Sequence, residues 1–144
     1  MFFKKKQHIF ITCTPKSGST YLLRLLESLL SYEVKIFIPA FDRSAQDIFE
    51  PNIIEILKIN TVGHQHTPCT DNNMRILNKY GIKPVILTRN IFDSVISMRN
   101  HILLEPENSW WPMGYVDHNF YDLTTEKQYD FIIDLIIPWY INFY

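Results

Sequence analysis

The chain has few of the residues that mark secreted or membrane proteins. Its 144 residues include two cysteines, Cys13 and Cys69, and four glycines. Two cysteines do not build the disulfide framework of a small secreted domain. No apolar stretch approaches the length of a membrane span, and the first apolar stretch is too short for an export signal. We therefore expect a cytoplasmic protein without a membrane span.

An excess of charge of either sign is also missing. Fourteen lysines and arginines stand against 15 acidic residues, which gives a net charge of −1. A balanced chain of this kind lacks the broad basic face that nucleic acid requires. With 47% hydrophobic and 20% charged residues, the composition is typical of a soluble globular protein. We predict one domain over residues 1–144 and no nucleic-acid partner.

Hydrophobic patterning predicts strands that alternate with helices. Apolar, β-branched runs indicate strands at 8–14, 34–39, 60–67 and 83–90, the last being the clearest buried strand. Helical spacing predicts helices over 20–30, 44–59, 71–80, 91–104 and from Thr125, where Thr125 and Gln128 form a capping box. This alternation predicts a three-layer α/β/α fold with a mostly parallel sheet covered on both faces.

The loop between the first strand and helix has the composition of a phosphate-binding loop. It reads "TPKSGST" over residues 14–20. Gly18 lets the backbone approach a ligand, and the following helix directs its amides and positive dipole toward it. Lys16 adds a mobile charge, and Ser17, Ser19 and Thr20 add hydroxyl donors. The alternative is a plain strand-to-helix turn with serine and threonine caps.

An ordinary nucleotide-triphosphate loop fits this stretch poorly. That consensus opens with a second glycine and carries its lysine after the last one, whereas Lys16 precedes Gly18. Two further polar residues lie at the ends of other predicted strands, namely His66 near the end of 60–67 and Arg89 at the end of 83–90. Ligands of such sheets bind beyond the carboxyl ends of the strands. The three groups therefore belong to one candidate site, although the sequence leaves the strand order open.

Two motifs together resemble the PAPS-dependent sulfotransferases. "TPKSGST" followed by Tyr21 is similar to their 5′-phosphosulfate-binding loop. "LTRNIFDSVIS" is similar to their second motif, an Arg-Asn at a strand end with a serine eight positions beyond the arginine. Here these residues are Arg89, Asn90 and Ser97. The resemblance extends to residues 129–144, where "WYINFY" is similar to the helix that follows in some members, and it implies a P-loop-NTPase-like fold.

The resemblance implies a role for each matching residue. Residues Ser17 to Thr20 would hold the 5′-phosphate of 3′-phosphoadenosine 5′-phosphosulfate (PAPS), and Lys16 would stabilise the leaving phosphate. Arg89 and Ser97 would bind the 3′-phosphate, and Ser97 would also hold Lys16 back until acceptor arrives. From the residues alone, Arg89 also fits a surface ion pair, and Ser97 a hydroxyl bonded to its own helix.

A histidine before a proline-containing turn resembles the general base of the same family. "HTP" places His66 there, and histidine suits proton transfer near neutral pH. His64 shares its strand face and is the alternative base, unless both histidines are structural. The pattern H-x-H-x-x-C, formed by His64, His66 and Cys69, could also supply three zinc ligands. No fourth ligand suggests itself, and we expect no metal.

The remaining features concern the acceptor and the end of the chain. Residues 105–124 form a long aromatic loop that either covers an acceptor or packs against the last helix. The apolar run from Phe131, interrupted by Asp134 and Pro138, predicts a buried helix that could also support a homo-oligomer. Members of the resembled family continue into a glycine-rich and basic third segment that is not found here. We therefore expect the chain to be the N-terminal portion of a longer family domain.

The resulting hypothesis is transfer of a sulfonate group from PAPS to an acceptor hydroxyl or amine, with no metal required. The acceptor would be a small molecule, a glycan or a lipid. A non-catalytic module that binds the nucleotide bisphosphate is the first alternative, and a P-loop-like small-molecule kinase is the second. Lys16 before the glycine favours sulfonate transfer over the kinase.

Overall fold

The structure is a computed structural model that describes residues 6–38, 46–106, 110–111 and 113–143. Part of the predicted strand over 34–39 and of the predicted helix over 44–59 lies outside the described residues. Of the described parts, residues 35–38 are not in a strand and the helix is confined to 50–56, so both predicted ranges are too long. The strands are β1 (His8–Cys13), β2 (Glu33–Val34), β3 (Thr61–Gln65), β4 (Pro84–Leu87), β5 (Trp110–Trp111) and β6 (Gly114–Tyr115). The helices are α1 (Ser19–Leu30), α2 (Glu50–Ile56), α3 (Asp71–Tyr80), α4 (Ile91–Leu104) and α5 (Thr125–Ile141), with a 3₁₀ turn, η1 (His118–Asp122).

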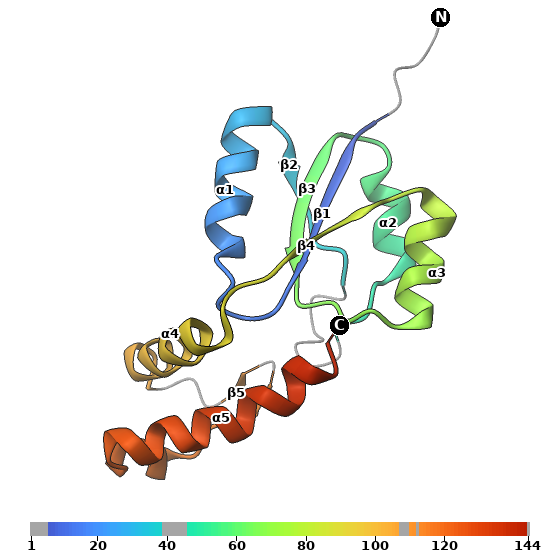
Figure 1. The fold of residues 1–144 in the computed structure, drawn as a ribbon. Helices are drawn as coiled ribbons and strands as arrows, with labels where there is room; N and C mark the ends of the chain where they lie inside the picture. The colour runs from blue at the N-terminus through green and yellow to red at the C-terminus, as the bar shows by residue number, and fades with distance from the viewer. Residues whose placement is uncertain (1–5, 39–45, 107–109, 112, 144) are drawn as a thin grey trace, which may run out of the picture.

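Four strands form one parallel sheet in the order β2-β3-β1-β4. In the registers of β1, Thr12 pairs with Gln65 of β3 and Cys13 pairs with Leu87 of β4. Helix α1 covers one face of this sheet, and α2 and α3 cover the other (Figure 1). The predicted three-layer α/β/α fold is confirmed. The central position of β1 places the loop that follows it between the ends of β3 and β4.

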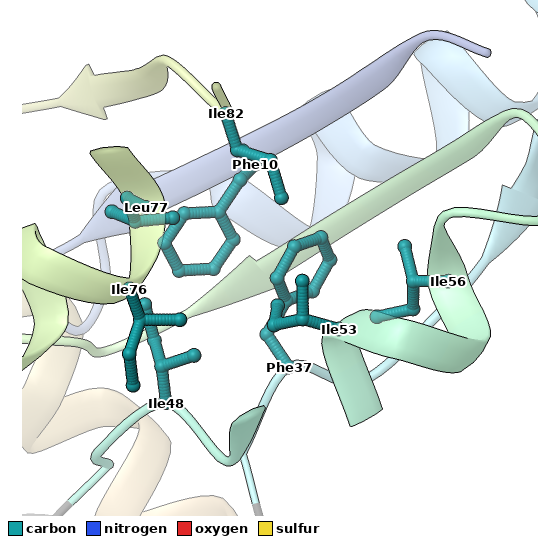
Figure 2. Close-up of a cluster of buried hydrophobic side chains, with 8 residues drawn as sticks. All are labelled: Phe10, Phe37, Ile48, Ile53, Ile56, Ile76, Leu77 and Ile82. Carbon is teal, nitrogen blue, oxygen red and sulfur yellow. The ribbon is translucent and has the colours of Figure 1, made fainter. Parts of the chain in front are cut away.

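Side-chain alternation along β1 builds a core on each face of the sheet. Phe10 stacks on Phe37, with ring centroids 4.5 Å apart, in a cluster that α2 and α3 cover (Figure 2). Ile11 points to the opposite face, where it packs with Leu23 of α1 and Val62 of β3. Burial of such aliphatic and aromatic side chains supplies roughly 1.5–3 kcal/mol each. Both cores therefore fix β1 between its helices.

Strand β4 is less buried than its sequence predicts. It lies at the edge of the sheet, where Val85 is 46% exposed and Ile86 is 60% exposed. A continuous apolar run is typical of a strand covered on both faces. The pattern does not indicate, however, whether the strand has another strand on each side or lies at the edge of the sheet. The prediction of a buried strand over 83–90 is therefore wrong for these side chains.

Helices α4 and α5 form a second packed unit beyond the carboxyl ends of the strands (Figure 1). Its core is a cluster of buried residues, namely Val95, Met98, Ile102, Val116, Phe120, Ile132 and Ile136. The predicted aromatic loop contains the antiparallel pair β5–β6 and η1, and its Trp111, Met113 and Tyr121 pack against this cluster. Most of the aromatic segment therefore contributes to packing, which was one of the two predicted alternatives.

Helix α5 differs in two details from the prediction. Its N-cap is Thr124, whose side chain accepts a hydrogen bond from the Lys127 amide, so the predicted Thr125–Gln128 capping box is wrong. Gln128 instead donates to the Phe120 carbonyl and accepts from Arg99. Pro138 lies inside the helix, which continues to Ile141. No helix in the described part of the chain is long and apolar enough to cross a membrane.

Candidate functional site

The predicted site residues follow three adjacent strands. Lys16 follows β1, His66 follows β3, and Arg89 follows β4. Because the sheet is parallel and β1 lies between β3 and β4, the three segments meet at one edge. The strand order that the sequence left open thus brings Lys16, His66 and Arg89 to the same end of the sheet. One hydrogen bond joins His66 to β1, and another joins Arg89 to the loop after β1.

The loop after β1 is held in shape by its own polar groups. The Ser17 hydroxyl donates to the Thr14 carbonyl at 2.6 Å, and it lies 2.9 Å from the Thr14 hydroxyl. Lys16 and Gly18 both have a left-handed backbone, with φ of 64° and 87°. Alternating right- and left-handed residues turn successive backbone N–H groups toward one side, an arrangement that binds anions. The Ser17 hydroxyl therefore shapes the loop and is itself buried.

Helix α1 begins with its first amides open to a ligand. Gly18 is its N-cap, and no side chain of a described residue caps the helix. A β-carbon built on Gly18 meets no atom within 4 Å, so the space beside this residue is open. Thr20 is exposed beside this space, whereas Ser19 is buried. Backbone amides, the helix dipole and the Thr20 hydroxyl thus provide the donors that an anion needs here.

Arg89 contacts the loop directly. Its Nη1 donates to the Lys16 carbonyl at 3.1 Å, across 73 positions of sequence. The side chain is not in a surface ion pair, which was the alternative prediction, because no carboxylate of a described residue lies within salt-bridge distance of it. The contact leaves other guanidinium donors for a ligand, since arginine carries five. Arg89 therefore adds its charge at the rim of the loop.

The Lys16 ammonium lies in a mixed electrostatic environment. Partial burial lowers its pKa from the usual 10.5, and the nearby Arg89 charge lowers it further, whereas the Glu105 carboxylate opposes both effects. Glu105 follows α4 and also lies 3.6 Å from Nδ1 of His101, an interaction that depends on protonation of the ring. A lysine beside a second cation and partly shielded from water gains most from an anionic ligand.

Ser97 is not joined to the other predicted residues. It lies in the middle of α4, two turns beyond the Asn90 N-cap. No hydrogen bond links its hydroxyl to Lys16, to Arg89 or to any other described residue. Asn90 itself caps α4 by accepting from the Phe92 amide at 2.9 Å. The role that the resemblance implies for Ser97 at the 3′-phosphate therefore stays a prediction.

The His66 ring is fixed by the backbone of β1. Nδ1 lies 2.8 Å from the Cys13 carbonyl oxygen, and because a carbonyl only accepts, Nδ1 carries the proton. The neutral ring then has its lone pair on Nε2, the atom that a general base uses. Burial lowers the pKa of His66 below 6.5, although the Cys13 carbonyl opposes the shift and His64 adds to it. His66 is therefore a neutral, oriented imidazole near neutral pH.

His64 is a weaker candidate for the base. Its ring centroid lies 6.4 Å from that of His66, at an interplanar angle of 83°. Burial lowers its pKa, and the Arg24 charge on α1 contributes to the same shift. Arg24 interacts with Glu27 at 2.8 Å on the flank of α1. His64 therefore lies within the electrostatic influence of Arg24 on α1.

The zinc alternative finds no support in the arrangement of these residues. In the described part of the chain, no three histidine, cysteine or acidic side chains come together as ligands for one metal ion. Cys69 is exposed, whereas Cys13 is buried. The Sγ atom of Cys13 lies 3.6 Å from Nδ1 of His66. Burial raises the pKa of the Cys13 thiol, so it is not a thiolate near neutral pH.

An open cavity of 520 Å³ adjoins His66. The C-terminal half of α5 supplies four of its lining residues, and Trp139 lies edge-on to the imidazole with centroids 6.4 Å apart. Sequence reasoning missed this contribution of α5, because Asp134 and Pro138 were interpreted as interruptions of an apolar run. The signal was their spacing of four residues, which places both on one face of a helix.

The end of α5 also contacts the loop after β1. The Tyr140 hydroxyl donates a short hydrogen bond to the Pro15 carbonyl. Close by, the Cys69 amide donates to the Phe143 carbonyl at 3.3 Å. Neither contact follows from the sequence pattern, because both join segments that are distant along the chain. The phosphate-loop candidate and the cavity therefore share one structural support.

Comparison of the chain with protein-family models, with curated proteins and with solved structures finds no match. The function is therefore inferred from the residues of the site.

Proposed function

We propose that the protein transfers a sulfonate group from PAPS to an acceptor hydroxyl or amine. The observation that carries this proposal is the hydrogen bond from Arg89 to the Lys16 carbonyl. It joins the two motifs on which the sulfotransferase resemblance rests, although 73 positions separate them. A donor with a phosphate at both its 3′ and 5′ positions needs cations of this kind at two points of one site.

The loop after β1 has the properties that the donor requires. Open amides at the start of α1 and the left-handed backbone at Lys16 and Gly18 suit the 5′-phosphate. Arg89, at the rim, suits the 3′-phosphate. Lys16 precedes Gly18 and so serves the bond between phosphate and sulfate rather than a β,γ-phosphate pair. These features favour a phosphosulfate over a nucleoside triphosphate.

The proposed reaction is an in-line displacement at sulfur. The acceptor oxygen or nitrogen forms a bond to sulfur while the bond from sulfur to the bridging oxygen breaks, and its electron pair stays on the 5′-phosphate. Nε2 of His66 takes the acceptor proton, and the Lys16 ammonium stabilises the charge on the leaving phosphate. Positioning and electrostatics account for most of the catalysis, as in phosphoryl transfer.

Donor binding is tested by isothermal titration with 3′-phosphoadenosine 5′-phosphate and, separately, with ATP and Mg²⁺. We expect the bisphosphate to bind more tightly to the wild-type chain. Lys16→Ala and Arg89→Ala should each weaken its binding by about tenfold or more, since hydrogen bonds to charged groups contribute about 1.5–3 kcal/mol. Arg75→Ala is the matched control, because Arg75 lies on α3 and bonds to Asn72. Tighter binding of ATP with Mg²⁺ would refute the proposal.

Catalysis is tested by measuring sulfonate transfer from PAPS to a panel of phenols and amines. Lys16→Ala and His66→Ala should each abolish most of the activity. Unchanged transfer in both variants would show that the catalytic assignment is wrong. If the bisphosphate binds and the wild-type chain transfers to no acceptor, the chain is instead a non-catalytic nucleotide-binding module.

A further inference from the structure

Strand β4 has one edge that no other described strand covers. It ends the strand order β2-β3-β1-β4, so β1 is its single neighbour among the strands of the described residues. Because the main-chain groups of a strand point alternately to its two sides, alternate residues of β4 direct their N–H and C=O groups away from β1. Such an edge is a template for pairing with another extended chain. Strand β4 therefore offers main-chain hydrogen bonds to a further strand.

Apolar side chains are exposed on both faces of this edge. Val85 pairs with Ile11, which packs with Leu23 of α1, so Val85 lies on the face that α1 covers. Ile86 is the next residue and lies on the opposite face, and both side chains are exposed. A docked helix would cover only one of the two faces. An added strand covers both, because its successive side chains point to opposite faces. The exposure of both residues therefore fits a strand as the partner.

A small cavity opens beside Ile86 on the face that α3 covers. Its volume is 130 Å³, and its mainly apolar wall includes Phe10 of β1, Met74 and Leu77 of α3, and Pro84. An engineered protein cavity of about 150 Å³ accommodates a benzene ring, so this cavity has room for one apolar side chain. Residues directly opposite each other on neighbouring strands share a face. The residue opposite Ile86 in an added strand therefore lies at this cavity, where leucine is suitable.

Two cationic residues flank the edge. Lys83 directly precedes β4 and is exposed, and no carboxylate of a described residue lies within salt-bridge distance of it. Arg89 follows the strand, and its side chain bonds to the Lys16 carbonyl. Opposite charges on neighbouring strands stabilise the pairing, whereas like charges destabilise it. A two-fold axis would pair β4 with itself in antiparallel orientation and bring Lys83 of one copy beside Arg89 of the other. The charges therefore favour a partner with acidic ends over a second copy.

We propose that the open edge of β4 binds an extended segment of another protein, with an apolar centre and an acidic residue at each end. The segment adds a strand to the sheet through main-chain hydrogen bonds, and its central side chain enters the cavity beside Ile86. The side chains next to the central one cover Val85, and one acidic end pairs with Lys83. This interaction goes beyond the proposed function, because it needs neither PAPS nor the cavity beside His66.

The probe is the peptide acetyl-Glu-Thr-Val-Leu-Val-Thr-Glu-amide, and its binding to the whole chain is measured by isothermal titration. With leucine opposite Ile86, the glutamates lie opposite Lys83 and Arg89, and the palindromic sequence makes this independent of strand direction. Asparagine in place of leucine should weaken binding about tenfold or more, because the cavity loses its apolar side chain.

The charge of the edge is tested with a variant of the chain. We expect Lys83→Glu to weaken binding of the glutamate peptide by about fivefold, because an attraction between neighbouring strands becomes a repulsion. Lys58→Glu is the matched control, since Lys58 pairs with Glu55 beside α2. Absence of binding to the wild type, equal binding of the leucine and asparagine peptides, or an equal effect of the two variants would overturn the inference.

Two further measurements identify the bound form and the occupant. Saturating peptide should slow amide hydrogen exchange within β4, and N-methylation of those alternate peptide residues that face β4 should abolish binding, whereas methylation of the intervening residues is tolerated. Equal effects of the two methylation patterns, or unchanged exchange in β4, would show that no strand is added. We expect the wild-type chain alone to sediment as a monomer. A dimer that Ile86→Lys dissociates would show that a second copy occupies the edge, and it would overturn the inference.

Discussion

Lys16 adopts a backbone conformation that glycine would adopt at lower cost. Its φ of 64° lies in the left-handed region, where a side chain other than glycine costs roughly 1–2 kcal/mol. Strained residues of this kind are found where contacts with the surrounding structure offset the strain, and they cluster at functional sites. Here the neighbouring Ser17 and Arg89 hold the loop through hydrogen bonds. These contacts therefore stabilise a backbone conformation at Lys16 that a lysine does not favour by itself.

Two substitutions at Lys16 separate strain from charge. Both Lys16→Gly and Lys16→Ala remove the ammonium, but only glycine relieves the left-handed backbone. We expect Lys16→Gly to be about 1 kcal/mol more stable than Lys16→Ala in urea unfolding, with binding of the bisphosphate weakened equally in both. Equal stability of the two variants would show that the loop is not strained at this position.

The pH dependence of His66 follows from its burial. Its pKa is lowered below 6.5 in the folded protein, so the unfolded chain binds a proton first as the pH falls. Stability is therefore greatest above pH 6.5 and decreases as the pH drops toward the folded-state pKa. We expect the free energy of unfolding, measured in urea at several pH values between 5 and 7.5, to change less with pH in His66→Gln than in the wild type. An NMR titration of the imidazole with a midpoint at or above 6.5 would contradict this prediction.

At the scale of single elements, β3 depends on a glycine that permits close packing. A β-carbon on Gly63 would lie 2.5 Å from the Lys35 carbonyl and 2.7 Å from the Phe37 ring, so the backbone or the ring would have to move. We expect Gly63→Ala to lower the free energy of unfolding by about 2–3 kcal/mol. Gly18→Ala, which meets no atom, should cost only the roughly 1 kcal/mol of its left-handed backbone. A smaller loss in Gly63→Ala than in Gly18→Ala would refute this account of the strand.

Local sequence patterns predicted the bounds of several helices well, but they did not predict how the elements are arranged around one another. Helices α1, α3 and α4 begin and end within about one residue of their predicted ranges, because capping and hydrophobic spacing are local properties. The exposure of β4 depends on its place at the sheet edge, which no local pattern encodes. The short pair β5–β6 lacks the alternation of a longer strand, so residues 105–124 were predicted as a loop.

The candidate site was predictable as a set of residues but not as contacts. Lys16, His66 and Arg89 were identified because they lie at or just after the ends of predicted strands, and the parallel sheet explains why they converge. The bond from His66 to the Cys13 carbonyl, which determines the tautomer, depends on the order of the strands. The cavity depends on the return of α5 to the sheet, a long-range contact that local sequence patterns do not predict.

The whole molecule consists of a sheet with its helices and of a unit formed by α4 and α5. Their connection at the site includes the Tyr140 hydrogen bond to Pro15, the Phe143 bond to Cys69 and the contact of Trp139 with His66. The α4–α5 unit has its own apolar core. The loop after β1 is thus ordered from two sides, by the sheet and by the end of α5.

Removal of one hydroxyl tests this connection. We expect Tyr140→Phe to cost about 1 kcal/mol and to accelerate amide hydrogen exchange in residues 14–18, because the Pro15 carbonyl loses its donor. Tyr129→Phe is the control, since the Tyr129 ring packs over Arg99 and its hydroxyl bonds to no described residue. Unchanged exchange of the loop in Tyr140→Phe would show that α5 does not order it.

The central position of β1 also fixes the dimensions of the site. Neighbouring strands in a sheet lie about 4.8 Å apart, so the ends of β3 and β4 are separated by about 10 Å with β1 between them. This width is set by main-chain hydrogen bonds and does not depend on which side chains stand at the strand ends. Substitutions of Lys16, His66 or Arg89 can therefore change the chemistry of the site while the distance between the ends of β3 and β4 stays constant.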